Sequence, residues 1–272
     1  MKSLSSFSHG RWFVVPRPIS NLRLRLFCFP YAGGGAFAFR RWAERVPRGV
    51  ELCGVQLPAR EGRFNEPAYT RLTDLVRDLA EVVGPATDIP FAFFGHSMGA
   101  LVAFALAREL RRAHGRGPEL LMVSGHRAPQ RPDPHPPIHA LPAPEFLQEL
   151  RELNGTPEAI FRDEELLQLL VPILRADFEV CETFEYEHER PLECPIVAFG
   201  GEVDPDVPRE DLEAWSEQTT ASFSLRMFPG DHFYFVNRPA ALLDEMARQL
   251  EMVGVRSRSE GAEVSIIEGK SQ

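Results

Sequence analysis

The sequence predicts an α/β protein in which helices cover both faces of a mostly parallel sheet. Short apolar stretches alternate along the chain with amphipathic stretches, and this alternation is typical of parallel strands joined by helices. The chain has 272 residues, and 44% of them are hydrophobic, so it can bury one sizeable core. These observations favour a globular fold of ordinary composition.

The elements follow one another in a regular order. Strands are expected at 23–29, 50–57, 91–95, 119–125, 195–201 and 223–229. Helices are expected at 37–46, 70–83, 98–113 and about 239–252. The segment 70–83 illustrates the helical pattern, because one face of it collects the apolar residues Leu72, Leu75, Val76, Leu79 and Val82.

Residues 130–190 interrupt this alternation. The stretch 129–145 is crowded with proline, which excludes regular helix or strand there, and amphipathic helical patterns follow it. We therefore expect a core of residues 1–129 and 191–253, with a helical insertion at 130–190 between two strands of the sheet. Residues 254–272 have little apolar content, which predicts a flexible tail.

Composition excludes several classes of function. The net charge of −9 disfavours binding to nucleic acid or to an anionic membrane. No apolar run approaches membrane-spanning length, and the N-terminal stretch WFVV is too short for a signal peptide. The four cysteines lack CxxC spacing, so we expect buried free thiols, with no zinc or other metal site. A cytoplasmic enzyme or binding protein fits these observations.

The stretch PFAFFGHSMGALVAFALA (90–107) places a serine between two glycines at an expected strand-to-helix junction. A nucleophile elbow needs such a tight turn to project Ser97 above the sheet. Gly95 and Gly99 would leave room where side chains would clash, and the helix start offers N–H groups to negative charge. The alternative is a glycine-rich turn whose serine caps the helix. The neighbouring strand and helix favour the elbow.

A serine hydroxyl needs a general base, and elbow enzymes have the chain order serine, acid, histidine. His232, in FPGDHFYF, follows the last expected strand, where that order requires the base. The acid is expected in GGEVDPDVP, after the strand at 195–201. The turn that Pro205 imposes favours Asp204 over Asp206. Asp204 would hold the imidazole tautomer and stabilise the imidazolium.

Two backbone N–H groups are needed to stabilise an oxyanion. One is expected from Met98, directly after the serine, and the other from the loop FPYAGGG (29–35). The run GGGAFA (33–38) also matches a dinucleotide-binding pattern. That alternative requires an acid at the end of the second strand, and the next carboxylate is only Glu61. The sequence therefore disfavours an NAD-binding oxidoreductase.

Six motifs together resemble the type II thioesterases of polyketide and nonribosomal peptide assembly lines. They are LFCFPYAGGGAFAFRRWA, VQLPAREGRF, FAFFGHSMGALVAFALARELR, LMVSGHRAP, FGGEVDP and FPGDHFYF. The resemblance runs from about residue 20 to 252 and implies the α/β-hydrolase fold, with 130–190 as its helical lid. It also implies the catalytic triad Ser97, Asp204 and His232, and an oxyanion hole formed by the N–H groups of Ala32 and Met98.

The resemblance implies a serine hydrolase that acts on carrier proteins. Such an enzyme cleaves acyl thioesters from the phosphopantetheine arm of acyl or peptidyl carrier proteins, and so clears stalled or aberrant acyl groups. The substrate carries the phosphopantetheine, and no cofactor of the enzyme is expected. The alternatives are a general esterase or an acyltransferase with the same triad, the NAD-binding oxidoreductase, and a catalytically silent binding protein.

Two further sets of residues are candidates for substrate recognition. The apolar lid residues Phe146, Leu150, Leu170 and Phe178 are candidates to line the acyl chamber, with ordinary helix packing as the alternative. Carrier proteins of these assembly lines are usually acidic, so an acidic enzyme would need a local basic patch. Arg60 and Arg63 follow the carboxyl end of the second strand, on the face where α/β sheets bind ligands. They are the expected docking residues, with solvated loop arginines as the alternative.

Overall fold

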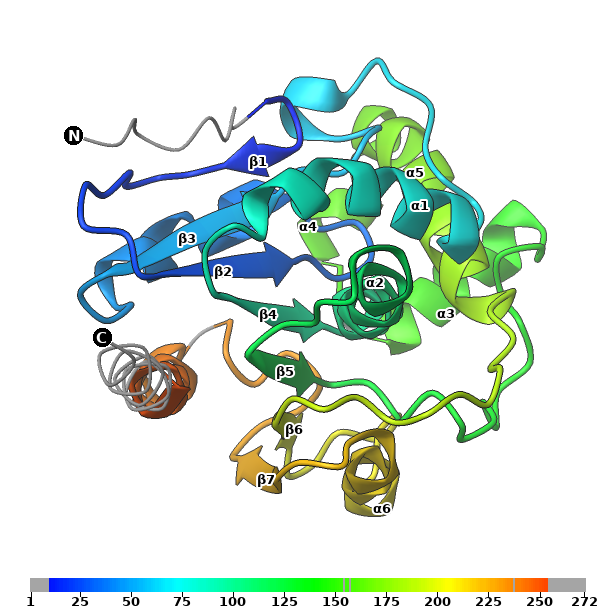
Figure 1. Cartoon of the computed structure of the whole chain (residues 1–272). Coiled ribbons are helices and arrows are strands. Elements are labelled where there is room, and N and C mark those ends of the chain that lie inside the picture. The colour runs from blue at the N-terminus through cyan, green and yellow to red at the C-terminus, as the bar shows by residue number, and fades with distance from the viewer. Residues whose placement is uncertain (1–9, 154, 157, 237, 254–272) are drawn as a thin grey trace, which may run out of the picture.

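A seven-stranded sheet forms the centre of the protein (Figure 1). The computed structural model describes residues 10–153, 155–156, 158–236 and 238–253, and the predicted tail at 254–272 lies outside them. The strand order is β1-β3-β2-β4-β5-β6-β7, and every neighbouring pair is parallel except β1 and β3. The strands are β1 (Phe13–Val14), β2 (Leu24–Phe29), β3 (Val50–Val55), β4 (Phe91–His96), β5 (Leu120–Ser124), β6 (Ile196–Gly201) and β7 (Phe223–Phe228).

The predicted α/β fold class is confirmed, and all six predicted strands are present. The short β1 is an addition, since two residues are too few to show a periodic pattern. The helices of the core are α1 (Leu72–Val83), α2 (Met98–His114), α6 (Arg209–Glu213) and a last helix at 240–253. Short 3-10 helices are η1 (Ala36–Glu44), η2 (Glu61–Arg63), η3 (Gly84–Ala86) and η4 (Ala214–Gln218).

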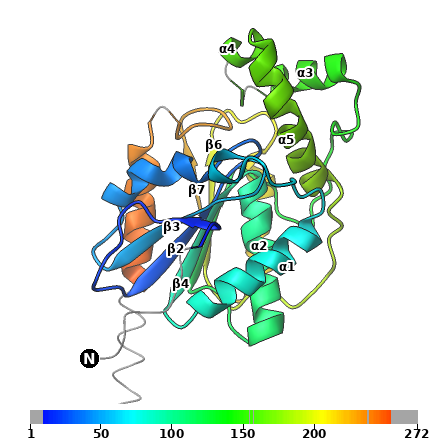
Figure 2. The same cartoon turned by 90° about the horizontal axis from the view of Figure 1, so that it is seen from above.

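Helices lie on both faces of the sheet (Figure 2). Strand β2 illustrates why the buried strands are mostly apolar, with Arg25 as its one charged residue. Its Phe27 and Phe29 pack in the core that contains α1 and α2, while Leu26 and Cys28 pack in the core that contains η1 and the last helix. Both faces of each central strand are therefore buried, so an alternating pattern of polar residues is absent.

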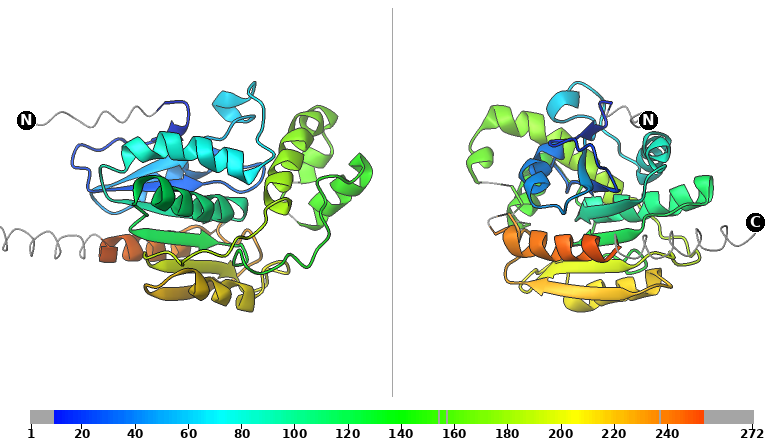
Figure 3. Two further views of the ribbon diagram at one scale, coloured as in Figure 1. Left: turned by 45° about the vertical axis from the view of Figure 1, so that its right-hand side comes forward. Right: turned by 60° about the vertical axis from the view of Figure 1, so that its left-hand side comes forward.

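Three helices between β5 and β6 form the helical insertion. They are α3 (Ala143–Glu152), α4 (Glu158–Phe161) and α5 (Glu164–Glu182), and they stand over the carboxyl ends of the parallel strands (Figures 2 and 3). A small apolar cluster of their own holds them together; it includes Phe146, Leu150, Phe161 and Leu174. We call residues 130–190 the lid.

The cysteines and the helices can be compared with the expectations from composition. The four cysteines are free thiols, and Cys28, Cys53 and Cys194 are buried, as expected. None of the helices in the described part of the chain combines the length and the apolar character of a membrane span.

Candidate active site

Ser97 occupies a strained turn between β4 and α2. Its backbone has φ 52° and ψ −122°, although it is not a glycine. A side chain in this sparsely populated region costs of order 1–3 kcal/mol, so the surroundings must impose it. The N–H group of Ser97 donates to the carbonyl oxygen of Ser124 at 2.8 Å, which ties the turn to the end of β5. The predicted elbow conformation is therefore present.

The two glycines of the motif are required by close backbone contacts. A Cβ atom at Gly95 would lie 2.0 Å from the carbonyl oxygen of Gly99. A Cβ atom at Gly99 would lie 2.2 Å from the carbonyl oxygen of Phe29. Real Cβ atoms do not approach backbone oxygens this closely, so the prediction that these glycines leave room for the turn is confirmed.

His232 and Asp204 are joined by a hydrogen bond. His232 Nδ1 lies 2.8 Å from Asp204 Oδ2, and the carboxylate side chain is fully buried. Asp204 Oδ1 accepts the N–H groups of Asp206 at 3.0 Å and Val207 at 3.2 Å. The carboxylate is placed to accept the Nδ1 proton of His232, which leaves Nε2 as the basic nitrogen of the ring.

Asp206 has a different role in the same turn. Its backbone N–H donates to Asp204, and its own carboxyl makes no hydrogen bond to His232 within the described residues. Burial, followed by the nearby Asp204 carboxylate, raises the pKa of the Asp206 carboxyl. Of the two candidates, Asp204 is thus the one that orients the histidine.

Loops from several strand ends bring His232 beside the elbow. The ring of His232 lies 4.9 Å from the ring of His96, which directly precedes Ser97 (centroid to centroid). A Cβ atom at Gly125 would lie 3.2 Å from His232 Cε1 and 2.6 Å from His96 Cε1. Close packing at the ends of β4 and β5 therefore brings the histidine loop next to Ser97, although the residues are far apart in sequence.

His96 is a buried residue whose part in the site the sequence did not indicate. Its Nδ1 lies 2.9 Å from Ser124 Oγ, and Ser124 Oγ lies 2.7 Å from the hydroxyl of Tyr234. Burial lowers the pKa of His96 well below its usual value, and the neighbouring His232 lowers it further. The His96 ring is thus neutral and packs against the ring of His232. The signal available in the sequence was the apolar strand that ends in this histidine.

The loop after β2 lies under the lid. The N–H of Gly33 donates to Asp177 Oδ2 at 2.7 Å, and the carbonyl oxygen of Gly34 accepts from Arg60 at 3.1 Å. Ala32 packs against the apolar cluster of the lid. On the other side, Met98 is the first residue of α2, so its N–H has no partner within the helix. Ala32 and Met98, whose N–H groups are the expected donors of the oxyanion hole, lie on these two segments, and their role stays a prediction.

The glycine run does not form a nucleotide-binding turn. It leads into the 3-10 helix η1 rather than into an α-helix. The carboxylate of Glu61 accepts the N–H of Phe37 at 3.1 Å and lies against Gly35. A negative charge at this position would repel a pyrophosphate. The described residues also contain no group of three or more His, Cys, Asp or Glu that could hold a metal ion.

The prediction that Arg60 and Arg63 form a docking surface is wrong, because both side chains are buried. Arg60 forms a two-pronged ion pair with Asp177 of α5, with both N–O distances 2.7 Å. Arg63 binds Glu66 at 2.6 Å, and its guanidinium lies 3.9 Å above the ring of Trp12. Glu66 is only three residues from Arg63, whereas Asp177 lies more than a hundred residues from Arg60 and is not indicated by local sequence.

The four chamber candidates fall into two groups. Phe146 and Leu150 are buried inside the lid cluster, where they hold α3 against α5. Leu170 and Phe178 are partly exposed at its margin, and the ring of Phe178 packs edge-on against Phe146 at 6.0 Å. Helix packing therefore accounts for Phe146 and Leu150, and a chamber lining by Leu170 and Phe178 stays a prediction.

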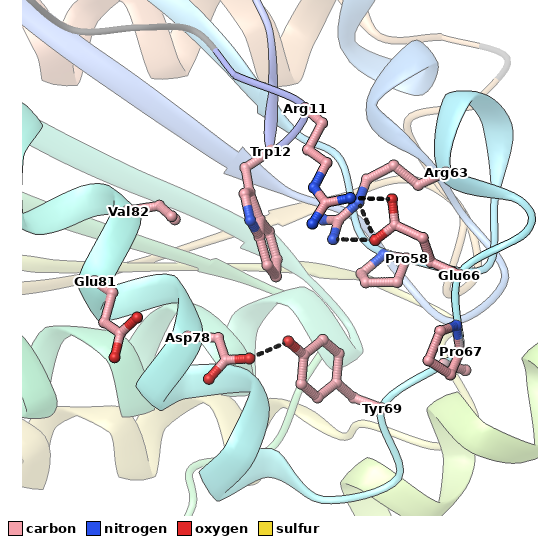
Figure 4. A pocket seen from close by; sticks show the side chains of 11 residues that line it. Arg11, Trp12, Pro58, Arg63, Glu66, Pro67, Tyr69, Asp78, Glu81 and Val82 are labelled. Carbon is pink, nitrogen blue, oxygen red and sulfur yellow. Dashed lines mark hydrogen bonds and ion pairs between the residues drawn. The ribbon is translucent and has the colours of Figure 1, made fainter.

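A separate hollow lies between the segment that precedes β1, the loop after β3 and α1. Its volume is about 380 Å³, and Trp12, Arg63 and Tyr69 are among the residues that line it (Figure 4). The Tyr69 hydroxyl bonds to Asp78 across it. None of Ser97, Asp204 and His232 lines this hollow, so it is distinct from the candidate active site.

Comparison with known proteins identifies the family. The model of the thioesterase domain family matches residues 24–250. The gramicidin S biosynthesis protein GrsT of Aneurinibacillus migulanus is 48% identical over 244 residues, which cover 90% of this chain and 95% of GrsT. Thioesterase PikA5 of Streptomyces venezuelae is 42% identical over 231 residues, which cover 83% of this chain and 80% of PikA5.

A solved structure gives the same result. The type II thioesterase BorB from the borrelidin biosynthetic cluster matches with a TM-score of 0.80 at 37% identity, over 88% of this chain and 97% of BorB. The family match includes the strands from β2 to β7 and the turn of Ser97 between Gly95 and Gly99. The chain therefore belongs to the thioesterase domain family and is a thioester hydrolase with the α/β-hydrolase fold.

Proposed function

We propose that this enzyme hydrolyses acyl thioesters on the phosphopantetheine arm of carrier proteins, and that it clears stalled or aberrant acyl groups from polyketide or nonribosomal peptide assembly lines. The observation that carries the proposal is the His232–Asp204 hydrogen bond beside the strained Ser97. The names of three similar proteins support the substrate class: GrsT is a gramicidin S biosynthesis protein, BorB is a type II thioesterase from the borrelidin biosynthetic cluster, and ClbQ belongs to the colibactin NRPS/PKS pathway. The same proposal places the enzyme in the cytoplasm with those assembly lines.

Ser97, His232 and Asp204 each have one role in the proposed reaction. Ser97 Oγ attacks the thioester carbonyl carbon while His232 Nε2 takes the hydroxyl proton. Asp204 holds the Nδ1 proton and stabilises the imidazolium. The negative charge on the carbonyl oxygen is stabilised by the N–H groups of Ala32 and Met98.

The two halves of the reaction are then symmetric. The C–S bond breaks, and His232 returns its proton to the leaving sulfur, which leaves an acyl-serine. Water attacks that ester with His232 again as base, so that Ser97 is restored and the carboxylic acid is released. Every proton is accounted for by His232 and water, so this reaction requires neither a metal ion nor a cofactor of the enzyme.

The test is the intact mass of an acyl-loaded carrier protein after incubation with the enzyme. We expect the mass to fall to that of the unloaded phosphopantetheine form. Ser97→Ala should slow this change by several orders of magnitude, because removal of a triad member typically does so. A Ser97→Ala variant that keeps more than a tenth of the wild-type rate contradicts the assignment of the nucleophile.

A simple aryl ester measured side by side separates the alternatives. If the enzyme cleaves the ester rapidly and the mass of the acyl-loaded carrier protein does not change, the enzyme is a general esterase. Transfer of the acyl group to an added alcohol or amine, instead of water, indicates an acyltransferase. Hydrolysis of neither substrate by a folded enzyme contradicts the proposal as a whole.

A further inference from the structure

A buried ion pair joins three segments that are distant in sequence. Arg60 lies in the loop after β3, Asp177 lies on the lid helix α5, and both contact the loop of Gly33 and Gly34 after β2. The side chains of Arg60 and Asp177 are only 6% and 4% exposed. The pair therefore lies inside the protein, where the lid meets the loop that carries Ala32.

Every polar group of the pair has a defined partner. The guanidinium of Arg60 donates to both Asp177 oxygens at 2.7 Å, to the Gly34 carbonyl oxygen at 3.1 Å and, through Nε, to the Pro58 carbonyl oxygen at 3.0 Å. Asp177 Oδ2 also accepts the N–H of Gly33 at 2.7 Å. Charge-assisted, two-pronged contacts of this kind fix orientation as well as distance.

Stability alone is a poor reason for such a pair. Removing two charges from water costs about as much as their attraction returns, and apolar replacements of buried pairs are often neutral or stabilising. What this pair does provide is a fixed geometry for the glycine loop. Gly33 has φ 75° and thus the backbone freedom of a left-handed glycine, so the loop needs external contacts to hold one conformation.

The lid helix touches the same point of the loop. A Cβ atom at Gly33 would lie 2.7 Å from Leu174 Cδ2 of α5, and Asp177 is on the same helix, three residues further on. The peptide that follows Ala32 is thus held by a hydrogen bond to α5 and by packing against α5. If α5 moves away, Gly33 loses its acceptor and the loop loses its position.

We propose that the Arg60–Asp177 pair is a positioning device that aligns the oxyanion loop, so that the N–H of Ala32 is placed for catalysis only when α5 is seated on that loop. Neither side chain reacts. Arg60 also neutralises the Asp177 carboxylate, which would otherwise oppose the negative charge that develops on the substrate oxygen. This inference rests on the oxyanion role proposed for Ala32.

The test compares a carboxylate-to-amide change in this pair with the same change in a neighbouring pair. Asp177→Asn keeps the shape of the side chain and removes its charge. Glu66→Gln is the matched control, because Glu66 pairs with buried Arg63 in the same loop region at 2.6 Å and does not contact residues 32–34. Arg60→Lys keeps the charge, removes the two-pronged contact and provides a second, independent variant.

We expect Asp177→Asn and Arg60→Lys to lower kcat about 10- to 100-fold, as small misplacements of reacting groups do, with KM changed less than threefold. The substrates are an acyl-N-acetylcysteamine thioester and an aryl ester. Both need the oxyanion hole but no carrier protein, so the result is independent of whether carrier proteins are the substrates. Glu66→Gln should stay within twofold of the wild-type kcat.

A trifluoromethyl ketone separates alignment from plain structural support. Ser97 Oγ adds to its carbonyl, His232 takes the proton, and the negative oxygen mimics the transition state. Its affinity should fall by the same factor as kcat in both variants, while affinity for the uncharged thioether analogue stays constant. Unchanged ketone affinity, or a loss of melting temperature with unchanged kcat, overturns the proposal. The Arg60→Lys result decides the matter if Asp177→Asn does not fold.

Discussion

Both oxygens of the Asp204 carboxylate are in use. One accepts from the ring of His232, and the other accepts two backbone N–H groups of the turn that follows. The carboxylate is therefore fixed by its own turn before it orients the histidine. A group of this kind acts on the reaction through the tautomer of the ring, because only a protonated Nδ1 leaves Nε2 free to take the serine proton.

Asp204→Asn should lower kcat by about 10⁴, because the amide favours the wrong imidazole tautomer. Asp206→Asn should change kcat little, since Asp206 contributes its backbone N–H to the turn. The measurement is steady-state hydrolysis of an acyl thioester by both variants. The reversed result, with Asp206→Asn the inactive variant, would make Asp206 the triad member.

The residues predicted from sequence differ in how local their signals are. Asp204 follows from the turn that Pro205 imposes, and His232 follows from its place after the last strand. The burial of Arg60 could not be predicted from neighbouring residues. Its partner Asp177 is distant in sequence and comes close only because α5 packs against the loop after β2. His96 was equally hidden, since its partner Ser124 lies at the end of β5, and the Tyr234 hydroxyl that bonds to Ser124 comes from the loop after β7.

The elbow depends on the approach of β2, β4 and the start of α2. Gly99→Ala should lower the free energy of unfolding by at least about 1–3 kcal/mol, because overpacking against backbone atoms forces shifts. The nearest obstacle is the carbonyl oxygen of Phe29, a backbone atom that cannot rotate away. The measurement is equilibrium denaturation.

Gly117→Ala is the control for that measurement. Nothing lies within 4 Å of a Cβ atom at Gly117, so its substitution should leave the denaturation midpoint almost unchanged. Equal stability of Gly99→Ala and wild type would show that the elbow tolerates a side chain at this position.

The partly exposed margin of the lid is expected to limit the length of the acyl group. Bulky substitutions at its partly exposed margin, such as Leu170→Trp and Phe178→Trp, should shift hydrolysis toward short acyl groups. The same change at Leu150, which is buried in the lid cluster, should lower stability without that shift. The measurement is the rate of hydrolysis across a series of acyl chain lengths. An unchanged profile in both margin variants places the acyl chamber elsewhere.

For the molecule as a whole, stability in acid depends on two imidazoles, the buried His96 and the partly buried His126. Burial lowers the pKa of His126 to about 4 and lowers that of His96 well below its usual value. An unfolded chain binds these protons below about pH 6.5, whereas the folded chain does not. Stability is therefore fully present above about pH 6.5 and is lost as the pH falls toward 4.

His126→Gln should reduce the loss of stability between pH 6.5 and 4. The measurement is the free energy of unfolding across that range by denaturant titration. His188→Gln is the control, because His188 is exposed. A slope that is identical in His126→Gln and wild type would show that His126 is protonated equally in the folded and unfolded chains.

Most of the architecture follows from patterns that can be read along the chain. The six longer strands and the elbow are local features, and each was predicted within a few residues. The two-residue β1 and the 3-10 character of η1 were not, because neither has a periodic signal of its own. The position of α5 over the loop after β2 also depends on contacts between distant segments, and the periodicity of the sequence does not indicate such contacts.

The lid begins and ends on neighbouring strands. β5 and β6 are parallel neighbours, with Leu121 opposite Ile196, so the segment 130–190 follows the carboxyl end of one strand and leads back to the amino end of the strand beside it. The residues of the proposed triad, Ser97, Asp204 and His232, instead follow the carboxyl ends of β4, β6 and β7. If the lid lines the acyl chamber as predicted, such a segment could be exchanged as a unit and would change the acyl preference without changes to Ser97, Asp204 or His232. One link restricts that exchange: a foreign cassette must bring a carboxylate to the place of Asp177, or its recipient is left with Arg60 buried and unpaired.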